Sequence, residues 1–153
     1  MQIVTVAVSS PDSTLPECAL SAARHDVMKR RWRGTAADGA EFGFDLEKPL
    51  RHGAVFWQTD TVRYVLRQQP EPVVEIALDL PASAIAGVGW AIGNLHLELA
   101  AEPTRLLAPD EPAVRQLLDR IGIACRPTTA IFQPGRFARA QQAPHELGPS
   151  HRH

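Results

Sequence analysis

Hydrophobic and polar residues alternate with a period of two along most of the first 67 residues. This alternation predicts short strands that each bury one face. The expected strands are residues 2–8, 27–35, 41–46, 54–57 and 62–67. The tight-turn dipeptide Asp38–Gly39 joins the second and third of them into a hairpin. Leu20 to Arg24 lacks the alternation, and we expect a short helical turn there. Residues 1–69 therefore form an all-β domain in this interpretation.

The pattern changes after Gln68–Pro72, where two prolines predict an extended, weakly packed linker. Two apolar stripes with helical spacing follow, one on each of two predicted helices. Asp79 and Asp110 are the expected N-caps, and Gly122 is the expected left-handed residue that ends the second helix. The predicted elements are a strand at 73–78, a helix at 81–92, strands at 96–101 and 105–108, a helix from 110 to 121, and an edge strand at 123–132.

The order strand–helix–strand–strand–helix–strand is that of the ferredoxin-like βαββαβ arrangement. We therefore expect an α+β protein in which residues 73–135 form a ferredoxin-like domain behind the N-terminal all-β domain. Residues 136–153 are polar and without periodicity. This composition predicts a flexible tail.

The junction between the first helix and the next strand contains a histidine. Gly93 and Asn94 both tolerate the left-handed conformation that ends a helix, and we expect the helix to stop there. Leu97 and Leu99 then alternate with polar residues, which predicts a half-buried strand. His96 would lie at the start of that strand, on the face opposite the leucines. This position makes it available to a ligand or to a second subunit.

The chain has six histidines, and half of them fall within its last nine residues. Neutral imidazole is a common ligand for nickel, copper and zinc, so a tail that carries His145, His151 and His153 is a compositional signal for metal binding. His25 and His52 are expected to be exposed loop histidines.

Composition and motifs exclude several other functions. The net charge of -1 gives no overall attraction to nucleic acid, and the basic run Lys29–Arg33 is read as a solvated hairpin face. No apolar run is long enough to cross a membrane, and the N-terminus does not resemble a signal peptide. Cys18 and Cys125 form no metal or disulfide motif, and they are expected to be reduced. No catalytic motif is present, so we do not expect an enzyme.

Several segments resemble the urease accessory nickel metallochaperones of the UreE family over most of the chain. The matching segments are Arg31–Thr35, Asp38–Gly39, Phe44–Leu46, Ala91–His96, Arg105–Leu106, Leu117–Gly122 and Phe132–Pro134. The resemblance implies a peptide-binding-like β domain and a homodimer formed through the C-terminal domain. It implies that His96 meets its symmetry mate across the two-fold axis and binds Ni²⁺ there, with Zn²⁺ or Cu²⁺ as substitutes in vitro.

The same resemblance implies a cytoplasmic protein that delivers nickel to apo-urease. The implied partners are urease and other urease accessory proteins, including the accessory GTPase, without nucleic acid or membrane. The alternative is a protein-binding co-chaperone or scaffold module in which metal binding is incidental.

The chain departs from the family pattern at two places. Leu95 stands where the family has an arginine, which suggests that this position packs an interface. The segment 108–112 lacks the His-x-His pair that forms additional metal sites in some members, so those sites are not expected here.

Overall fold

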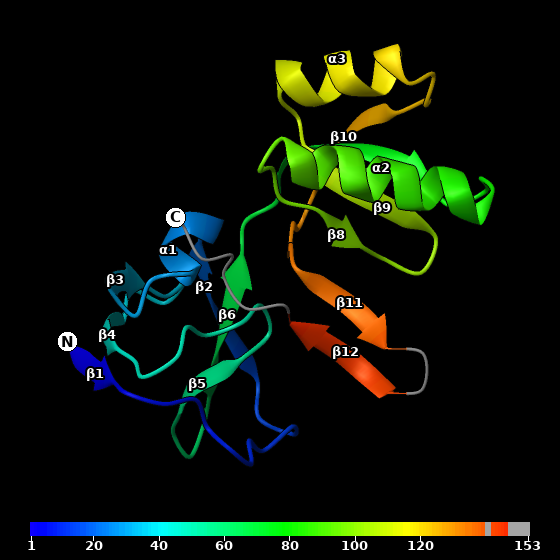
Figure 1. Cartoon of the computed structure of the whole chain (residues 1–153). Helices are drawn as coiled ribbons and strands as arrows, with labels where there is room; N and C mark the ends of the chain where they lie inside the picture. The colour runs from blue at the N-terminus through cyan, green and yellow to red at the C-terminus, as the bar shows by residue number, and fades with distance from the viewer. Residues whose placement is uncertain (140–141, 147–153) are drawn as a thin grey trace. The chain divides into compact units, whose positions relative to one another are not determined.

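The computed structural model describes residues 1–139 and 142–146, and the chain divides into two compact units between Gln69 and Pro70 (Figure 1). Unit 1 contains β1 (Gln2–Val4), β2 (Glu17–Ala22), α1 (Arg24–Val27), β3 (Arg31–Thr35), β4 (Glu41–Asp45), β5 (Val55–Gln58) and β6 (Arg63–Gln68). Unit 2 contains β7 (Glu71–Ala77), α2 (Ala82–Asn94), β8 (Ala100–Ala101), β9 (Arg105–Pro109), α3 (Pro112–Arg120), β10 (Arg126–Ala130), β11 (Arg136–Arg139) and β12 (Gln142–Glu146). Within the described residues, no helix has the length and hydrophobicity needed to span a membrane.

Unit 1 consists of two three-stranded sheets, ordered β1-β4-β3 and β2-β6-β5. Each sheet combines one parallel pair, β1 with β4 or β2 with β6, and one antiparallel pair. The prediction of a helical turn over Leu20 to Arg24 is wrong except at its last residue, because β2 continues to Ala22 and α1 begins only at Arg24. The small residues of β2 give no alternation. Parallel pairing with β6 and the full burial of Leu20 impose the strand instead.

The predicted Asp38–Gly39 hairpin is confirmed by the antiparallel pairing of β3 with β4. Gly39 has a φ of 89°, which a residue with a side chain rarely adopts. The Asp38 carboxylate accepts hydrogen bonds from the Ala40 N–H at 3.0 Å and the Tyr64 hydroxyl at 2.8 Å. These two bonds lower the pKa of Asp38, with the Ala40 bond as the larger cause. The turn is therefore fixed to β6 as well as closed on itself.

Aromatic rings fill the core of unit 1. Phe42 and Phe44 of β4 point inward and contact the ring of Phe56 edge to face, with centroids 5.0 and 5.2 Å apart. Trp32 stacks on Phe44 with ring centroids 4.1 Å apart. Because alternate residues of a strand face opposite sides, this inward pair places Gly43 on the outer face of the sheet.

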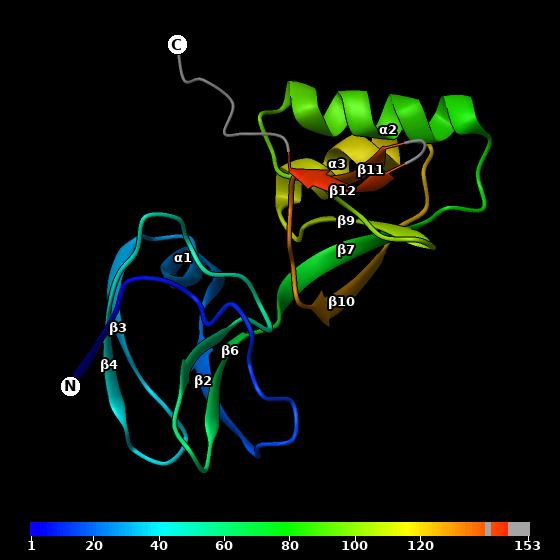
Figure 2. The same ribbon diagram turned by 90° about the horizontal axis from the view of Figure 1, so that it is seen from below.

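Unit 2 has a four-stranded sheet ordered β10-β7-β9-β8, in which every neighbouring pair is antiparallel. Figure 2 shows α2 lying over one face of this sheet, and the apolar stripes of both helices share a core with that face. The shared core joins helix residues such as Val88, Ile92 and Leu118 to strand residues such as Val74 and Ile76. The two predicted helices and the edge position of β10 are confirmed.

The junction between the units is shorter than the predicted linker. β6 ends at Gln68, whose side chain is buried, and β7 already begins at Glu71. Pro72 is therefore part of a strand, near its start, where the missing N–H is tolerated. Only Gln69 and Pro70 lie outside the flanking strands.

Neither predicted aspartate caps its helix. α2 begins at Ala82 after Pro81, and α3 begins after Glu111, in both cases without a side-chain cap. Asp110 instead accepts two hydrogen bonds from the guanidinium of Arg115, at 2.6 and 2.8 Å. The Arg115 bond lowers the pKa of Asp110. A guanidinium that donates two charged hydrogen bonds binds a carboxylate more strongly than a single backbone N–H at a helix start does.

The segment after Pro134 was expected to lack regular structure, but it contains two strands, the second of which ends at Glu146. β11 and β12 pair antiparallel, with Phe137 opposite His145. Gly135 leads into this hairpin with a φ of 77°, and its N–H donates to the Leu99 carbonyl at 2.9 Å. The pairing is set by main-chain hydrogen bonds, which the polar composition of the segment does not reveal.

His52 is half-buried, and it differs in this from the expected exposed loop histidine. Its Nδ1 accepts a hydrogen bond from the Gln68 N–H at 3.0 Å, which requires an unprotonated Nδ1. Burial, and secondly the charge of Arg67, lower the pKa of His52. Folding therefore favours the neutral imidazole.

We predict that unit 1 loses stability as the pH falls below about 6.5, the pKa of an unfolded histidine. There the unfolded chain binds a proton that folded His52 excludes, so the free energy of unfolding decreases with decreasing pH. Urea unfolding of a Trp90→Phe protein, followed by the fluorescence of Trp32 and Trp57, measures this in unit 1. His52→Gln should reduce the difference between pH 7.5 and 5.5, and an equal difference in both proteins would contradict the prediction.

Candidate metal centre

Helix α2 ends in a pair of backbone hydrogen bonds that place His96. The His96 N–H donates to the Gly93 carbonyl at 2.9 Å, and the Leu97 N–H reaches back to the Ile92 carbonyl at 3.4 Å. These are the two bonds of a Schellman motif, whose residue after the C-cap is left-handed. That residue is His96, with a φ of 57°. Leu97 and Ile92 belong to the same apolar core, which is the contact that usually accompanies the motif.

Two details of the predicted junction are wrong. Gly93 and Asn94 are helical, so the left-handed position lies two residues later than predicted. The strand expected over 96–101 is reduced to Ala100–Ala101. The apolar contact explains why the helix ends later than predicted. In a Schellman motif the residue two places beyond the C-cap packs against the helix, and here Leu97 packs in the core that contains the buried Ile92.

Helix α3 ends in the same motif with a different residue in the left-handed position. There the Gly122 N–H donates to the Asp119 carbonyl at 3.1 Å and the Ile123 N–H to the Leu118 carbonyl at 2.9 Å. Gly122 has a φ of 70°, as its sequence pattern predicts. Among the residues that the structure describes, His96 is the one non-glycine with a positive φ. A left-handed residue with a side chain costs about 1–2 kcal/mol, so α2 is closed less stably than α3.

The imidazole of His96 projects from an exposed position. Within the described part of the chain, no side-chain hydrogen bond or ion pair engages it. Backbone strain that persists at an exposed polar residue suggests a functional constraint, because glycine would close the helix with less strain. A free imidazole of this kind can donate one nitrogen lone pair to a metal ion.

The outward surface of α2 carries no charge. Ala82–Asn94 contains no acidic or basic residue, and Trp90 is 72% exposed. Leu95, next to His96, is 39% exposed. Trp90 is not singled out by the sequence analysis. It could have been, because Trp90 lies away from the buried positions Val88 and Ile92 on a helix that has no charged residues.

Of the other three predicted metal ligands, the structure describes the backbone of one. His145 lies on β12, while His151 and His153 lie outside the described residues. His25 is in unit 1, with its Nε2 3.1 Å from a carboxylate oxygen of Asp26. No group of three or more histidine, cysteine, aspartate or glutamate side chains suited to a metal ion occurs in the described part of the chain. His96 is the predicted ligand whose exposure the structure describes.

The fold and the site define a two-unit α+β protein that presents one exposed histidine from a strained helix end. The family model described as the UreE urease accessory protein, C-terminal domain, matches residues 71–153. The chain belongs to the UreE family of urease accessory proteins.

Three relatives show the extent of the similarity. The urease accessory protein UreE of Rhodobacter capsulatus is 34% identical over 128 residues, which cover 81% of this chain and 79% of the relative. The protein of the same name from Beijerinckia indica is 31% identical, with 81% and 72% covered. That of Azorhizobium caulinodans is 28% identical, with 94% and 68% covered. The similarity therefore includes both units.

We predict opposite stability effects at the two helix ends. His96→Gly should raise the free energy of unfolding by about 0.5–1 kcal/mol, because relief of the left-handed strain exceeds the added chain entropy of glycine. The mirror substitution Gly122→His should lower it by about 1 kcal/mol. Apart from its chain neighbours, no heavy atom lies within 4 Å of a Cβ built on Gly122, so backbone strain is the main cost expected there. Urea unfolding in the presence of a chelator measures both, and a destabilised His96→Gly protein would refute the strain.

Proposed function

We propose that the protein is a dimeric nickel carrier that delivers Ni²⁺ to apo-urease during assembly of the urease metal centre. The observation that carries the proposal is the exposed His96, held in a left-handed conformation at the end of α2. The family of the chain supports the role in urease maturation, since its relatives are named urease accessory proteins. The same role makes the protein an accessory factor and not an enzyme.

We infer a ferredoxin-like arrangement for residues 73–135. The support is the strand order β10-β7-β9-β8, which corresponds to the fourth, first, third and second strands of a βαββαβ unit. We assign residues 1–69 to a peptide-binding β domain. Residues 136–153 would act as the flexible, histidine-containing tail.

The imidazole of His96 alone provides too few ligands to hold nickel, and a second copy of the chain would supply another. Two His96 side chains would meet across a two-fold axis, where symmetry makes each chain contribute the same ligand. Water or the tail histidines His145, His151 and His153 would complete the coordination shell. An incompletely enclosed ion dissociates more readily than one in a closed four-ligand site, which suits a protein that must release its ion.

The charge-free surface of α2 is the proposed dimer interface. Charged residues are depleted from interface centres, whereas tryptophan is enriched there. Trp90 and Leu95 are exposed on a single chain and close in sequence to His96. Leu95 would then pack against the second copy.

Selectivity for nickel would come from partners and not from affinity. Copper binds most imidazole sites more tightly than nickel, and zinc binds them as well. Zn²⁺ or Cu²⁺ would therefore substitute in vitro. We propose that delivery occurs in the cytoplasm through contacts with apo-urease and other urease accessory proteins, including the accessory GTPase, without nucleic acid or membrane.

The alternative function is a protein-binding co-chaperone or scaffold in which metal binding is incidental. A hollow on the outer face of the β1-β4-β3 sheet favours protein binding by unit 1. Pull-down of urease components with and without a chelator separates the two functions. Equal recovery in both would favour the alternative.

We predict that nickel titration by calorimetry gives one strong site per dimer, and that His96→Ala removes this site. The reason is that the variant loses both imidazoles on the proposed two-fold axis. His25→Ala is the matched control, because it removes an exposed histidine from unit 1. Unchanged affinity and stoichiometry in the His96→Ala protein would reject the interfacial site.

The tail ligands are tested in the same titration. Deletion of residues 147–153 removes His151 and His153 beyond the end of β12, and His145→Ala removes the third. Either change should weaken nickel binding or lower its capacity while the dimer persists. Binding equal to the unmodified protein in both would exclude these histidines from the shell.

We predict that Trp90→Glu converts the dimer to a monomer, because it buries a charge at the centre of the proposed interface. Met28→Glu is the control, since Met28 is 55% exposed in unit 1. Sedimentation velocity measures the mass of both variants. A Trp90→Glu dimer as stable as the control would place the interface elsewhere.

A further inference from the structure

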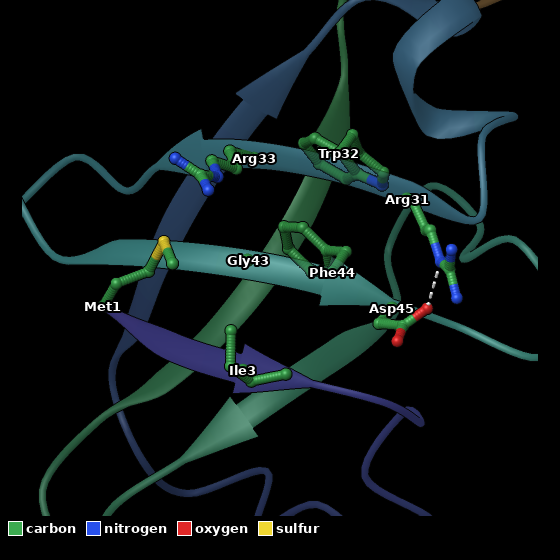
Figure 3. A pocket seen from close by; sticks show the side chains of 8 residues that line it. All are labelled: Met1, Ile3, Arg31, Trp32, Arg33, Gly43, Phe44 and Asp45. Carbon is green, nitrogen blue, oxygen red and sulfur yellow. Dashed lines mark hydrogen bonds and ion pairs between the residues drawn. The ribbon is translucent and has the colours of Figure 1, made fainter.

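The outer face of the β1-β4-β3 sheet contains a hollow of about 300 Å³. Figure 3 shows its floor at Gly43 on β4, with Arg33 of β3 on one side and Met1 and Ile3 on the other. The strand register explains this row, because Gly43 pairs with Ile3 in the parallel direction and with Arg33 in the antiparallel direction. The hollow is therefore built by three adjacent strands.

Gly43 lets the apolar side chains of Ile3 and Met1 lie close over β4. A Cβ atom at this position would lie 3.0 Å from Cδ1 of Ile3 and 3.6 Å from Sδ of Met1. Any side chain at position 43 would displace Ile3 and Met1 or project into the hollow. Glycine inside a strand weakens the strand, and it often marks a place where a ligand or another backbone approaches closely.

The two walls have different chemistry. Met1 and Ile3 are 62% and 55% exposed, so they form an apolar wall open to solvent. The opposite wall carries Arg33, for which no ion pair occurs within the described residues. Arg31 is already neutralised by Asp45, with Nε and Oδ1 2.7 Å apart. The guanidinium of Arg33 thus lies across Gly43 from the apolar side chains of Met1 and Ile3.

We propose that this hollow binds an extended segment of a partner protein in which a carboxylate side chain lies next to an apolar one. The carboxylate pairs with Arg33, and the apolar side chain packs on Met1 and Ile3. The inference rests on the proposed peptide-binding role of unit 1, and it adds the chemistry of the bound segment. Nucleic acid is disfavoured, because Arg31 is already paired with Asp45 and one remaining guanidinium is too few to hold successive phosphates.

The probe is an acetylated and amidated heptapeptide in which leucine and glutamate alternate, added to the nitrogen-15-labelled full chain. Trp32 borders the hollow while its ring stacks on Phe44 of the core, and its buried indole N–H has no acceptor within the described residues. Its indole resonance, assigned with Trp32→Phe, should shift on binding, whereas that of Trp90 in unit 2 should not. The same peptide with glutamine in place of glutamate should bind about tenfold more weakly, as expected for loss of a charged hydrogen bond.

Two variants test the walls and the floor. Arg33→Gln should weaken peptide binding about tenfold, and Gly43→Val should abolish it by filling the hollow. Arg30→Gln is the matched control, because Arg30 is exposed just before β3 and does not line the hollow. Arg33→Gln keeps the test valid if the Gly43→Val protein does not fold.

Several results would overturn the proposal. They are absence of a Trp32 shift at millimolar peptide, equal binding of the glutamine peptide, equal binding by Arg33→Gln, and tighter binding of a single-stranded oligonucleotide than of the peptide. Nickel titration of Arg33→Gln separates this proposal from the metal site. Arg33→Gln should bind nickel normally, so loss of peptide binding and loss of nickel binding are independent outcomes.

Discussion

The closure of helix α2 is the constraint on which the candidate metal centre depends. The last carbonyls of a helix need donors, and here the N–H groups of His96 and Leu97 supply them. The second bond brings the Leu97 side chain into the core and forces the residue before it into the left-handed conformation. The side chain at that residue then projects away from the domain. The exposure of His96 is thus a consequence of how the helix ends.

The strain at His96 is small enough for the fold to tolerate. A left-handed histidine costs about 1–2 kcal/mol, whereas a domain is typically stable by about 5–15 kcal/mol. The comparison with Gly122 shows that the same fold closes its other helix with glycine. A ligand on this turn is held by two hydrogen bonds and an apolar contact, which fix its backbone without enclosing its side chain. That combination suits a metal ligand that must meet a second copy.

The sequence predicts the elements of this protein better than their ends. Period-two alternation and the Asp38–Gly39 turn are sufficient for the hairpin, and the apolar stripes are sufficient for both helices. The helix ends are set by competition among partners, as when Asp110 pairs with Arg115 and leaves the helix uncapped. β2 and the β11–β12 hairpin depend on pairing with distant or polar strands, which local pattern does not encode. The Gly93–Asn94 stop signal and the alternation after it single out His96 as a candidate ligand, but they do not predict its left-handed backbone.

In the proposed dimer, metal binding and association are one equilibrium. A site that takes one imidazole from each chain exists only when two chains meet, so nickel stabilises the dimer and dilution weakens nickel binding. The apolar surface around Trp90 and Leu95 would reduce this dependence by supplying association energy that does not involve the ion. A charged residue at position 95 would contribute less to such packing and more to the electrostatics of the site. In the proposed dimer, the apolar Leu95 would therefore hold the two chains together before the metal binds, with His96 already positioned.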